Sequence, residues 1–161
     1  MPQFSRRDLT LLIIEDEEHV AKYLTTVLKN LFKTIEAVPS LKDGEQRLAA
    51  NHVDAVLLDL NLTNGAGLGP VQRLRGQYPY LPIIVMTGGS TPADDCMSAG
   101  ACDFLHKGSM SPHDVFDAVV KSVSRREAFR KLAEFDAASA HLGTAIEEGK
   151  AKLQERVAAA K

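Results

Sequence analysis

A small set of carboxylate, hydroxyl and ammonium side chains in this sequence has the chemistry needed for phosphoryl transfer. Each member follows a short apolar run, and the members are Glu15, Asp16, Asp59, Thr87 and Lys107. If folding gathers the three carboxylates, they repel one another unless a cation neutralises them. Mg²⁺ suits such a sparse oxygen site, because it takes one or two carboxylates and completes its coordination with waters and phosphate oxygens. We therefore expect Mg²⁺ as the cofactor.

A carboxylate of this set could also attack phosphorus and form an acyl phosphate. That reaction requires neutralisation of the charge on the transferred group, which the Lys107 ammonium group and Mg²⁺ would provide. Thr87 offers a hydroxyl donor, and Gly88 and Gly89 leave their backbone amides accessible to a phosphate oxygen. Taken singly, each residue has an ordinary structural explanation, such as a helix terminus or a turn. Their joint placement indicates a phosphoryl-transfer site.

To act together, these residues must lie at the carboxyl ends of neighbouring strands. Almost purely apolar runs at 9–14, 53–58 and 83–86 predict strands that are buried on both faces, as in a parallel sheet. Two further strands are expected at 34–38 and 102–105, each bounded by turn residues.

Helical patterns separate these strands. The strongest covers 17–32, where apolar residues recur at helical spacing at Val20, Leu24, Val27 and Leu31. Weaker patterns predict helices at 41–51 and 67–78, and a short polar helix within 91–98.

This strict alternation of strands and helices predicts an α/β fold. We expect a doubly wound, flavodoxin-like sheet of five parallel strands in the order 2-1-3-4-5, because each parallel pair needs a right-handed helical crossover. Ligands of such sheets bind where the strand order reverses, which here lies between the first and third strands. Glu15, Asp16 and Asp59 would converge at that point.

Residues 126–161 are expected to form a helical C-terminal extension to a first domain at 8–125. The composition shifts there to Ala, Glu, Lys and Arg, and small or apolar residues recur at alternating spacings of four and three. This seam is heptad-like, with flaws at Ser139 and Gly149. We expect an apolar stripe used for homodimerisation or partner docking, formed by Leu132, Phe135, Leu142, Ile146 and Leu153. A helix folded back on its own domain is the alternative.

The composition of the whole chain excludes several functions. The net charge is −2 and the 19 Lys and Arg residues are spread along the chain, so we expect no nucleic-acid binding by this chain alone. Cys96 and Cys102 lack the spacing of a metal site and are expected to be reduced thiols. No apolar run approaches the roughly 20 residues of a membrane span, and the N-terminus lacks a long apolar segment. We expect no membrane insertion and a cytoplasmic location.

Four segments of the sequence form a known pattern, both in their order and in the separations between them. They are LLIIEDEE, VLLDLNL, IIVMTGG and AGACDFLHKG. Over residues 8 to 125 the chain resembles the receiver domain of two-component response regulators, including the chemotaxis response regulators. The resemblance implies that Asp59 accepts a phosphoryl group from a histidine kinase or a histidine phosphotransfer protein. It also implies a Mg²⁺ site formed by Glu15, Asp16, Asp59 and the backbone carbonyl of Asn61.

The same resemblance implies a conformational switch. Thr87 would move onto the phosphoryl group, which Gly88 and Lys107 also contact, and Phe104 would turn inward to fill the vacated space. The surface of the fourth helix, fifth strand and fifth helix would then change and control a partner. Such a protein is not an enzyme beyond its own phosphorylation and autodephosphorylation.

The chain departs from the family pattern at two loop positions. Gly108 and Thr63 stand where many members have proline, which leaves the rigidity of both loops open. Nothing after Arg125 resembles an output domain, so we expect a stand-alone receiver or one cut from a longer regulator.

Three other functions compete with this interpretation of the sequence. A phosphohydrolase of the haloacid-dehalogenase type also uses a nucleophilic aspartate, but its DxD motif follows the first strand, and position 61 here is Asn. Nucleotide binding through Gly65, Gly67 and Gly69 lacks the GxGxxG pattern, because Pro70 occupies the place of its third glycine. An interaction module that is never phosphorylated stays open as the third alternative.

Overall fold

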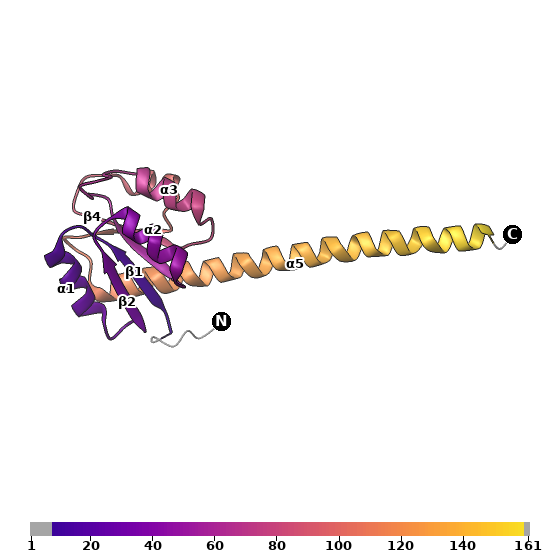
Figure 1. Ribbon diagram of the computed structural model, residues 1–161, viewed down its shortest axis with the longest axis horizontal. Helices are drawn as coiled ribbons and strands as arrows, with labels where there is room; N and C mark the ends of the chain where they lie inside the picture. The colour runs from indigo at the N-terminus through magenta and orange to yellow at the C-terminus, as the bar shows by residue number, and fades with distance from the viewer. Residues whose placement is uncertain (1–7, 160–161) are drawn as a thin grey trace. The chain divides into compact units, whose positions relative to one another are not determined.

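The computed structural model, which describes residues 8–159, contains a five-stranded parallel sheet within residues 10–106 (Figure 1). Its strands lie in the order β2-β1-β3-β4-β5, so the predicted fold class and strand order are confirmed. The strands are β1 (Thr10–Ile14), β2 (Thr34–Val38), β3 (Ala55–Asp59), β4 (Ile83–Thr87) and β5 (Asp103–His106). Each begins within two residues of its predicted start.

Five helices connect or follow the strands. They are α1 (Glu18–Leu28), α2 (Leu41–Ala50), α3 (Gly69–Gln77), α4 (Ala93–Ala99) and α5 (Pro112–Ala159). Ser40 is the N-cap residue of α2, because its Oγ accepts a hydrogen bond from the Asp43 N–H at 3.1 Å. The left-handed Gly100, with φ of 114°, ends α4.

The first helix is shorter than its apolar periodicity predicted. A helix was expected to reach residue 32, but α1 ends at Leu28 and the Leu31 N–H donates to the Leu28 carbonyl in a turn. This turn carries Phe32 into the core, where its ring packs edge-on against Phe116 with centroids 5.6 Å apart. Burial of that ring explains why the chain leaves the helix early.

Both faces of the sheet are covered by helices. Ile13 and Leu57 face a cluster with residues of α1 and α5, whereas Ile14 and Leu58 face a second cluster with residues of α2, α3 and α4. The alternation arises because successive side chains of a strand point to opposite faces. The core therefore holds the central strands β1, β3 and β4 rigidly, and their carboxyl ends with them.

The described chain divides into two compact units, one ending at Arg126 and the other beginning at Glu127. Arg126 binds the first unit, since its guanidinium donates to the Asp54 carbonyl at 3.1 Å and lies 3.5 Å from the Asp54 carboxylate. In the second unit, all residues from 128 to 159 are helical and exposed. The domain boundary expected at residue 125 stays a prediction, because compact packing does not show independent folding.

No helix within residues 8–159 combines the length and apolar character that a membrane span needs.

Cys96 is buried and Cys102 is half-buried, and both are free thiols. Burial raises the pKa of the Cys96 thiol, which makes it unreactive.

Candidate functional site

The carboxyl ends of four strands bring the predicted site residues together. Glu15 directly follows β1, Asp59 ends β3 and Thr87 ends β4. Lys107 directly follows β5, and its N–H donates to the Thr87 carbonyl at 2.9 Å. Because parallel strands end at the same edge of a sheet, positions far apart in the sequence become neighbours here.

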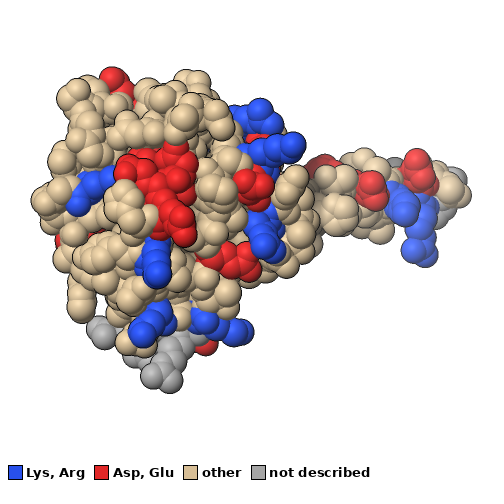
Figure 2. Space-filling model, turned by 60° about the vertical axis from the view of Figure 1, so that its left-hand side comes forward, with Lys and Arg blue, Asp and Glu red and all other residues tan. Residues whose placement is uncertain are grey.

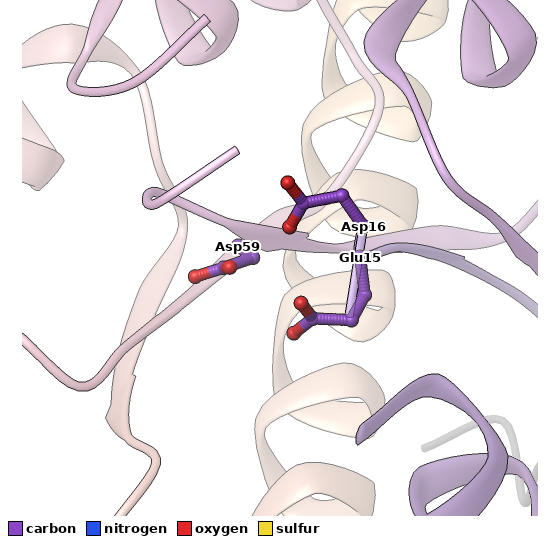
Figure 3. Close-up of side chains that lie close together, drawn as sticks. All are labelled: Glu15, Asp16 and Asp59. Carbon is purple, nitrogen blue, oxygen red and sulfur yellow. The ribbon is translucent and has the colours of Figure 1, made fainter. Parts of the chain in front are cut away.

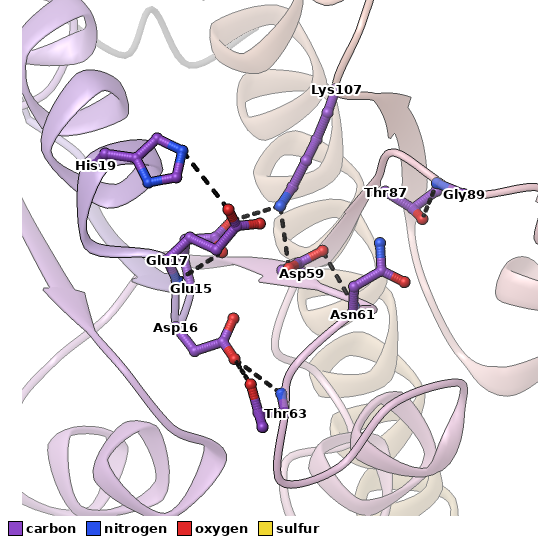
Figure 4. A network of polar contacts seen from close by, with 10 residues as sticks. All are labelled: Glu15, Asp16, Glu17, His19, Asp59, Asn61, Thr63, Thr87, Gly89 and Lys107. Carbon is purple, nitrogen blue, oxygen red and sulfur yellow. Dashed lines mark hydrogen bonds and ion pairs between the residues drawn. The ribbon is translucent and has the colours of Figure 1, made fainter.

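Lys107 connects two of the buried carboxylates (Figure 4). Its Nζ donates to Glu15 Oε2 at 2.6 Å and lies 3.0 Å from Asp59 Oδ2. Glu15 and Asp59 are 1% and 0% exposed, so neither carboxylate is well solvated. The single ammonium group therefore partly neutralises two acidic groups at once.

Burial and pairing shift the pKa values of Glu15 and Lys107. Burial raises the pKa of the Glu15 carboxyl, although the hydrogen bonds from Lys107 and from the Glu17 N–H oppose this. Burial alone would lower the pKa of Lys107, but the hydrogen bond to Glu15 and the ion pair with Asp59 prevail and raise it. Lys107 is therefore charged at neutral pH.

The two carboxylate oxygens of Asp59 lie in different surroundings. Its Oδ1 accepts a hydrogen bond from the Asn61 N–H at 3.1 Å, which places residue 61 directly beside it. Its Oδ2 is buried and, within the described residues, accepts no hydrogen bond of good geometry, with the Lys107 ion pair as its compensation. A buried acceptor oxygen without a hydrogen bond is available to bind a cation or to attack an electrophile.

Asp16 completes a cluster of three acidic residues (Figure 3). One carboxylate oxygen from each of Glu15, Asp16 and Asp59 lies within 4.8 Å of the other two. Asp16 is half-buried, and its Oδ2 accepts hydrogen bonds from both the N–H and the hydroxyl group of Thr63. These bonds lower the pKa of the Asp16 carboxyl, so it is ionised at neutral pH.

This donor set fits Mg²⁺. All of its ligand atoms are oxygens, two of the carboxylates are buried, and Asp59 carries a buried oxygen without a hydrogen bond. Acidic side chains gather on one face of the first unit, with Lys or Arg side chains near the edges of this patch (Figure 2).

Thr87 is fully buried, and its Oγ1 accepts the Gly89 N–H at 3.0 Å. The Gly89 amide, expected to be accessible, is thus engaged, whereas a side chain at Gly88 would meet open space. Phe104 is half-buried against the core cluster of α2, α3 and α4. Phe104 on β5 pairs with Val85 on β4. Val85 lies two positions before Thr87, so Thr87 and Phe104 lie on adjacent strands.

Comparison with known proteins gives the family. The model of the response regulator receiver domain matches residues 11–120, which is more than half of the chain. The chain belongs to this family. The receiver is 31% identical over 101 residues to the two-component response regulator PhoP of Pseudomonas aeruginosa, covering 62% of this chain and 45% of PhoP.

A second relative also supports membership of the receiver family. Over 99 residues the receiver is 32% identical to the KDP operon transcriptional regulatory protein KdpE of Escherichia coli, covering 60% of this chain and 44% of KdpE. The chain thus spans just under half the length of these two relatives.

Solved receiver structures share the fold. A response regulator receiver domain protein from Clostridium thermocellum superposes with a TM-score of 0.69 at 20% identity, covering 76% of this chain and 99% of the other. For a putative response regulator from Chloroflexus aurantiacus the TM-score is 0.64 at 27% identity, covering 72% and 98%.

One contact of the receiver site was not predicted from its sequence. Thr63 was noted only as a departure from proline, yet it supplies both hydrogen bonds to Asp16. The sequence signal was a hydroxyl residue in the loop that follows Asp59. The sequence could not show which side chain of the neighbouring strand that loop contacts.

Proposed function

We propose that this receiver accepts a phosphoryl group on Asp59 from a sensor histidine kinase or a histidine phosphotransfer protein. In this step the phosphorus–nitrogen bond of a phosphohistidine breaks, and a bond forms between phosphorus and an Asp59 carboxylate oxygen. The electron pair of the broken bond stays on the imidazole, and the product is an acyl phosphate. The observation that carries the proposal is the buried Asp59 oxygen 3.0 Å from the Lys107 ammonium group.

The residues that would hold Mg²⁺ are Glu15, Asp16 and Asp59, with the backbone carbonyl of Asn61. Their support is the 4.8 Å cluster of carboxylate oxygens and the position of Asn61 beside Asp59. When bound, Mg²⁺ would neutralise charge on the transferred group. Lys107 would neutralise part of the remaining charge, because its ammonium group already contacts the Asp59 carboxylate.

The phosphoryl group would act on a switch built from Thr87 and Phe104. The Thr87 hydroxyl and the amide of Gly88 would contact the phosphoryl oxygens, and Phe104 would turn inward. Phe104 is only half-buried and lies on the edge strand β5 beside β4, the strand that Thr87 ends. The surface of α4, β5 and α5 would thereby signal to a partner.

Mass spectrometry tests the phosphoacceptor. The full chain is treated with acetyl phosphate and Mg²⁺, and the expected product carries one phosphoryl group that Asp59→Asn lacks. Asp103→Asn is the matched control, because Asp103 is an aspartate on β5 that bonds the Phe104 N–H and lies outside the acidic cluster. An unmodified wild type, or equal modification of Asp59→Asn, would favour the unphosphorylated interaction module.

The second unit is proposed to pair with a second copy of itself. Its apolar side chains are widely exposed, with Leu132 at 57%, Leu142 at 63% and Leu153 at 62%. Lys131 and Asp136 flank the seam at positions that face each other across a parallel helix pair. Residues 127–161 hold six Lys or Arg and six Asp or Glu, so two copies do not repel each other through net charge.

Light scattering tests this pairing in the full chain. The wild type is expected to be a dimer, and Leu142→Glu together with Ile146→Glu is expected to be a monomer. Ala137→Glu is the control, since it adds charge on the same exposed helix outside the seam. A monomeric wild type would refute the pairing and leave the phosphoacceptor proposal intact.

The remaining proposals concern location and activity. Family membership supports a cytoplasmic protein that modifies only itself, and the net charge of −2 supports the absence of nucleic-acid binding by this chain alone.

A further inference from the structure

Thr63 holds the Asp16 carboxylate with every hydrogen-bond donor it has. Its backbone N–H donates to Asp16 Oδ2 at 2.8 Å, and its hydroxyl group donates to the same oxygen. The two residues are 47 positions apart, so the contact joins the loop after β3 to the end of β1. A proline at this position could make neither bond, because it has no N–H and no hydroxyl group.

Both bonds end on one oxygen, which leaves the other oxygen of Asp16 available. Figure 4 shows this second oxygen turned away from Thr63, toward the side of the site where Glu15 and Asp59 lie. Asp16 is only half-buried, so close packing does not by itself fix the direction of its carboxylate. Without Thr63 the carboxylate could rotate freely, and orienting it would oppose cation binding with a loss of conformational entropy.

We infer that Thr63 is a positioning residue that orients Asp16 for binding a hard divalent cation. The inference rests on the proposed function, because it assumes that the acidic cluster binds Mg²⁺. Hydrogen bonds to the outer oxygen of a ligating carboxylate fix its direction and commonly strengthen metal binding. The two Thr63 bonds supply this kind of support to Asp16.

Direct binding of Mn²⁺ to the unphosphorylated full chain tests the role of Thr63. Free Mn²⁺ is followed by electron paramagnetic resonance, so no phosphorylation activity is needed. Thr63→Val, which keeps the N–H, is expected to weaken binding about threefold to tenfold, the effect of one hydrogen bond. Thr63→Pro loses both donors and is expected to weaken it by roughly tenfold to a hundredfold. Thr63→Ser keeps both hydrogen-bond donors and should bind Mn²⁺ with wild-type affinity.

Two controls separate positioning from a general structural effect. Thr25→Val removes a threonine hydroxyl that bonds the Ala21 carbonyl within α1, and it should leave Mn²⁺ affinity unchanged. Thermal unfolding without metal should be only slightly easier for Thr63→Val, because one hydrogen bond to Asp16 is lost, while the stabilisation added by Mn²⁺ shrinks in the variant. In an Asp16→Asn background, Thr63→Val should have no further effect.

The possible outcomes also separate this inference from the proposed function. If wild type binds Mn²⁺ through Asp16 but both Thr63→Val and Thr63→Pro bind equally well, Thr63 has no positioning role and the metal site stands. If Thr63→Val weakens binding equally with and without Asp16, the inference is also overturned. If wild type and Asp16→Asn bind alike, or neither binds, the metal site itself fails and the inference falls with it.

Discussion

Lys107 Nζ lies 2.6 Å from Glu15 Oε2, although the two residues are 92 positions apart in the sequence. The bond joins the loop after β5 to the end of β1, across the two strands β3 and β4 that lie between them. The Lys107 side chain is 17% exposed and that of Glu15 is 0% exposed, so water screens this pair weakly. Stability of the metal-free receiver should therefore depend on this pair.

Replacing Lys107 with methionine should destabilise the metal-free receiver by roughly 3 kcal/mol at neutral pH, because two buried carboxylates lose their counter-charge. Urea denaturation monitored by circular dichroism measures the change. Lys121→Met is the control, since the Lys121 side chain is 59% exposed and its ammonium group lies 3.9 Å from the Asp103 carboxylate. That change should be about 0.5 kcal/mol or less. Equal effects of the two substitutions would show that the buried pair contributes nothing special.

Stability should depend on pH through Glu15 in a defined direction. The folded pKa of Glu15 is raised, so between the ordinary value and the raised one the folded chain binds more protons than the unfolded chain. Wild type should therefore gain stability relative to Glu15→Gln as pH falls through this window, and lose it as pH rises. Urea denaturation of both proteins in EDTA over a pH series measures the difference. Parallel curves would contradict the shift.

Gly44→Ala should destabilise the receiver even though alanine favours helices. A Cβ atom at Gly44 would lie 2.5 Å from Cδ1 and 3.1 Å from Cγ1 of the buried Ile14. Such overpacking costs about 1–3 kcal/mol, more than the helix preference of about 1 kcal/mol that alanine gains. Gly76→Ala in α3 meets no atom within 4 Å and should stabilise the protein. Thermal unfolding compares the two, and a stabilised Gly44→Ala would show that Ile14 yields easily.

Removing the cap of α2 should have a moderate effect. Ser40→Ala loses the bond to the Asp43 N–H and should cost about 1 kcal/mol, while Ser40→Thr keeps an oxygen acceptor and should cost less. Equilibrium urea unfolding with an unchanged slope is the expected result. If both variants matched wild type, solvent would satisfy this helix end as well as Ser40 does.

Much of this fold was predictable because its central strands are apolar on both faces and are regularly separated by helical patterns. Boundaries set by long-range packing were less predictable. The helix predicted through residue 32 ends at Leu28, since the Phe32 ring is buried in a core that includes Phe116, 84 positions later.

The gathering of Glu15, Asp59 and Lys107 followed from strand order alone, because each lies at the carboxyl end of a strand. The particular partners did not follow from it. Whether Lys107 meets Glu15, and whether Thr63 meets Asp16, depends on side-chain conformations and loop paths that no spacing encodes. The roles of these residues in phosphorylation stay predictions.

The distance in sequence between Glu15 and Lys107 also orders events during protein synthesis. A ribosome completes β1 and β3 well before it reaches β5, and these two strands are neighbours in the sheet. Glu15 and Asp59 can thus approach each other on a nascent chain that does not yet contain their shared ammonium group. Mutual repulsion of the two carboxylates then opposes early closure of the sheet. When β5 joins the sheet, the Lys107 ammonium group removes this barrier, so the last strand completes the charge balance of the site.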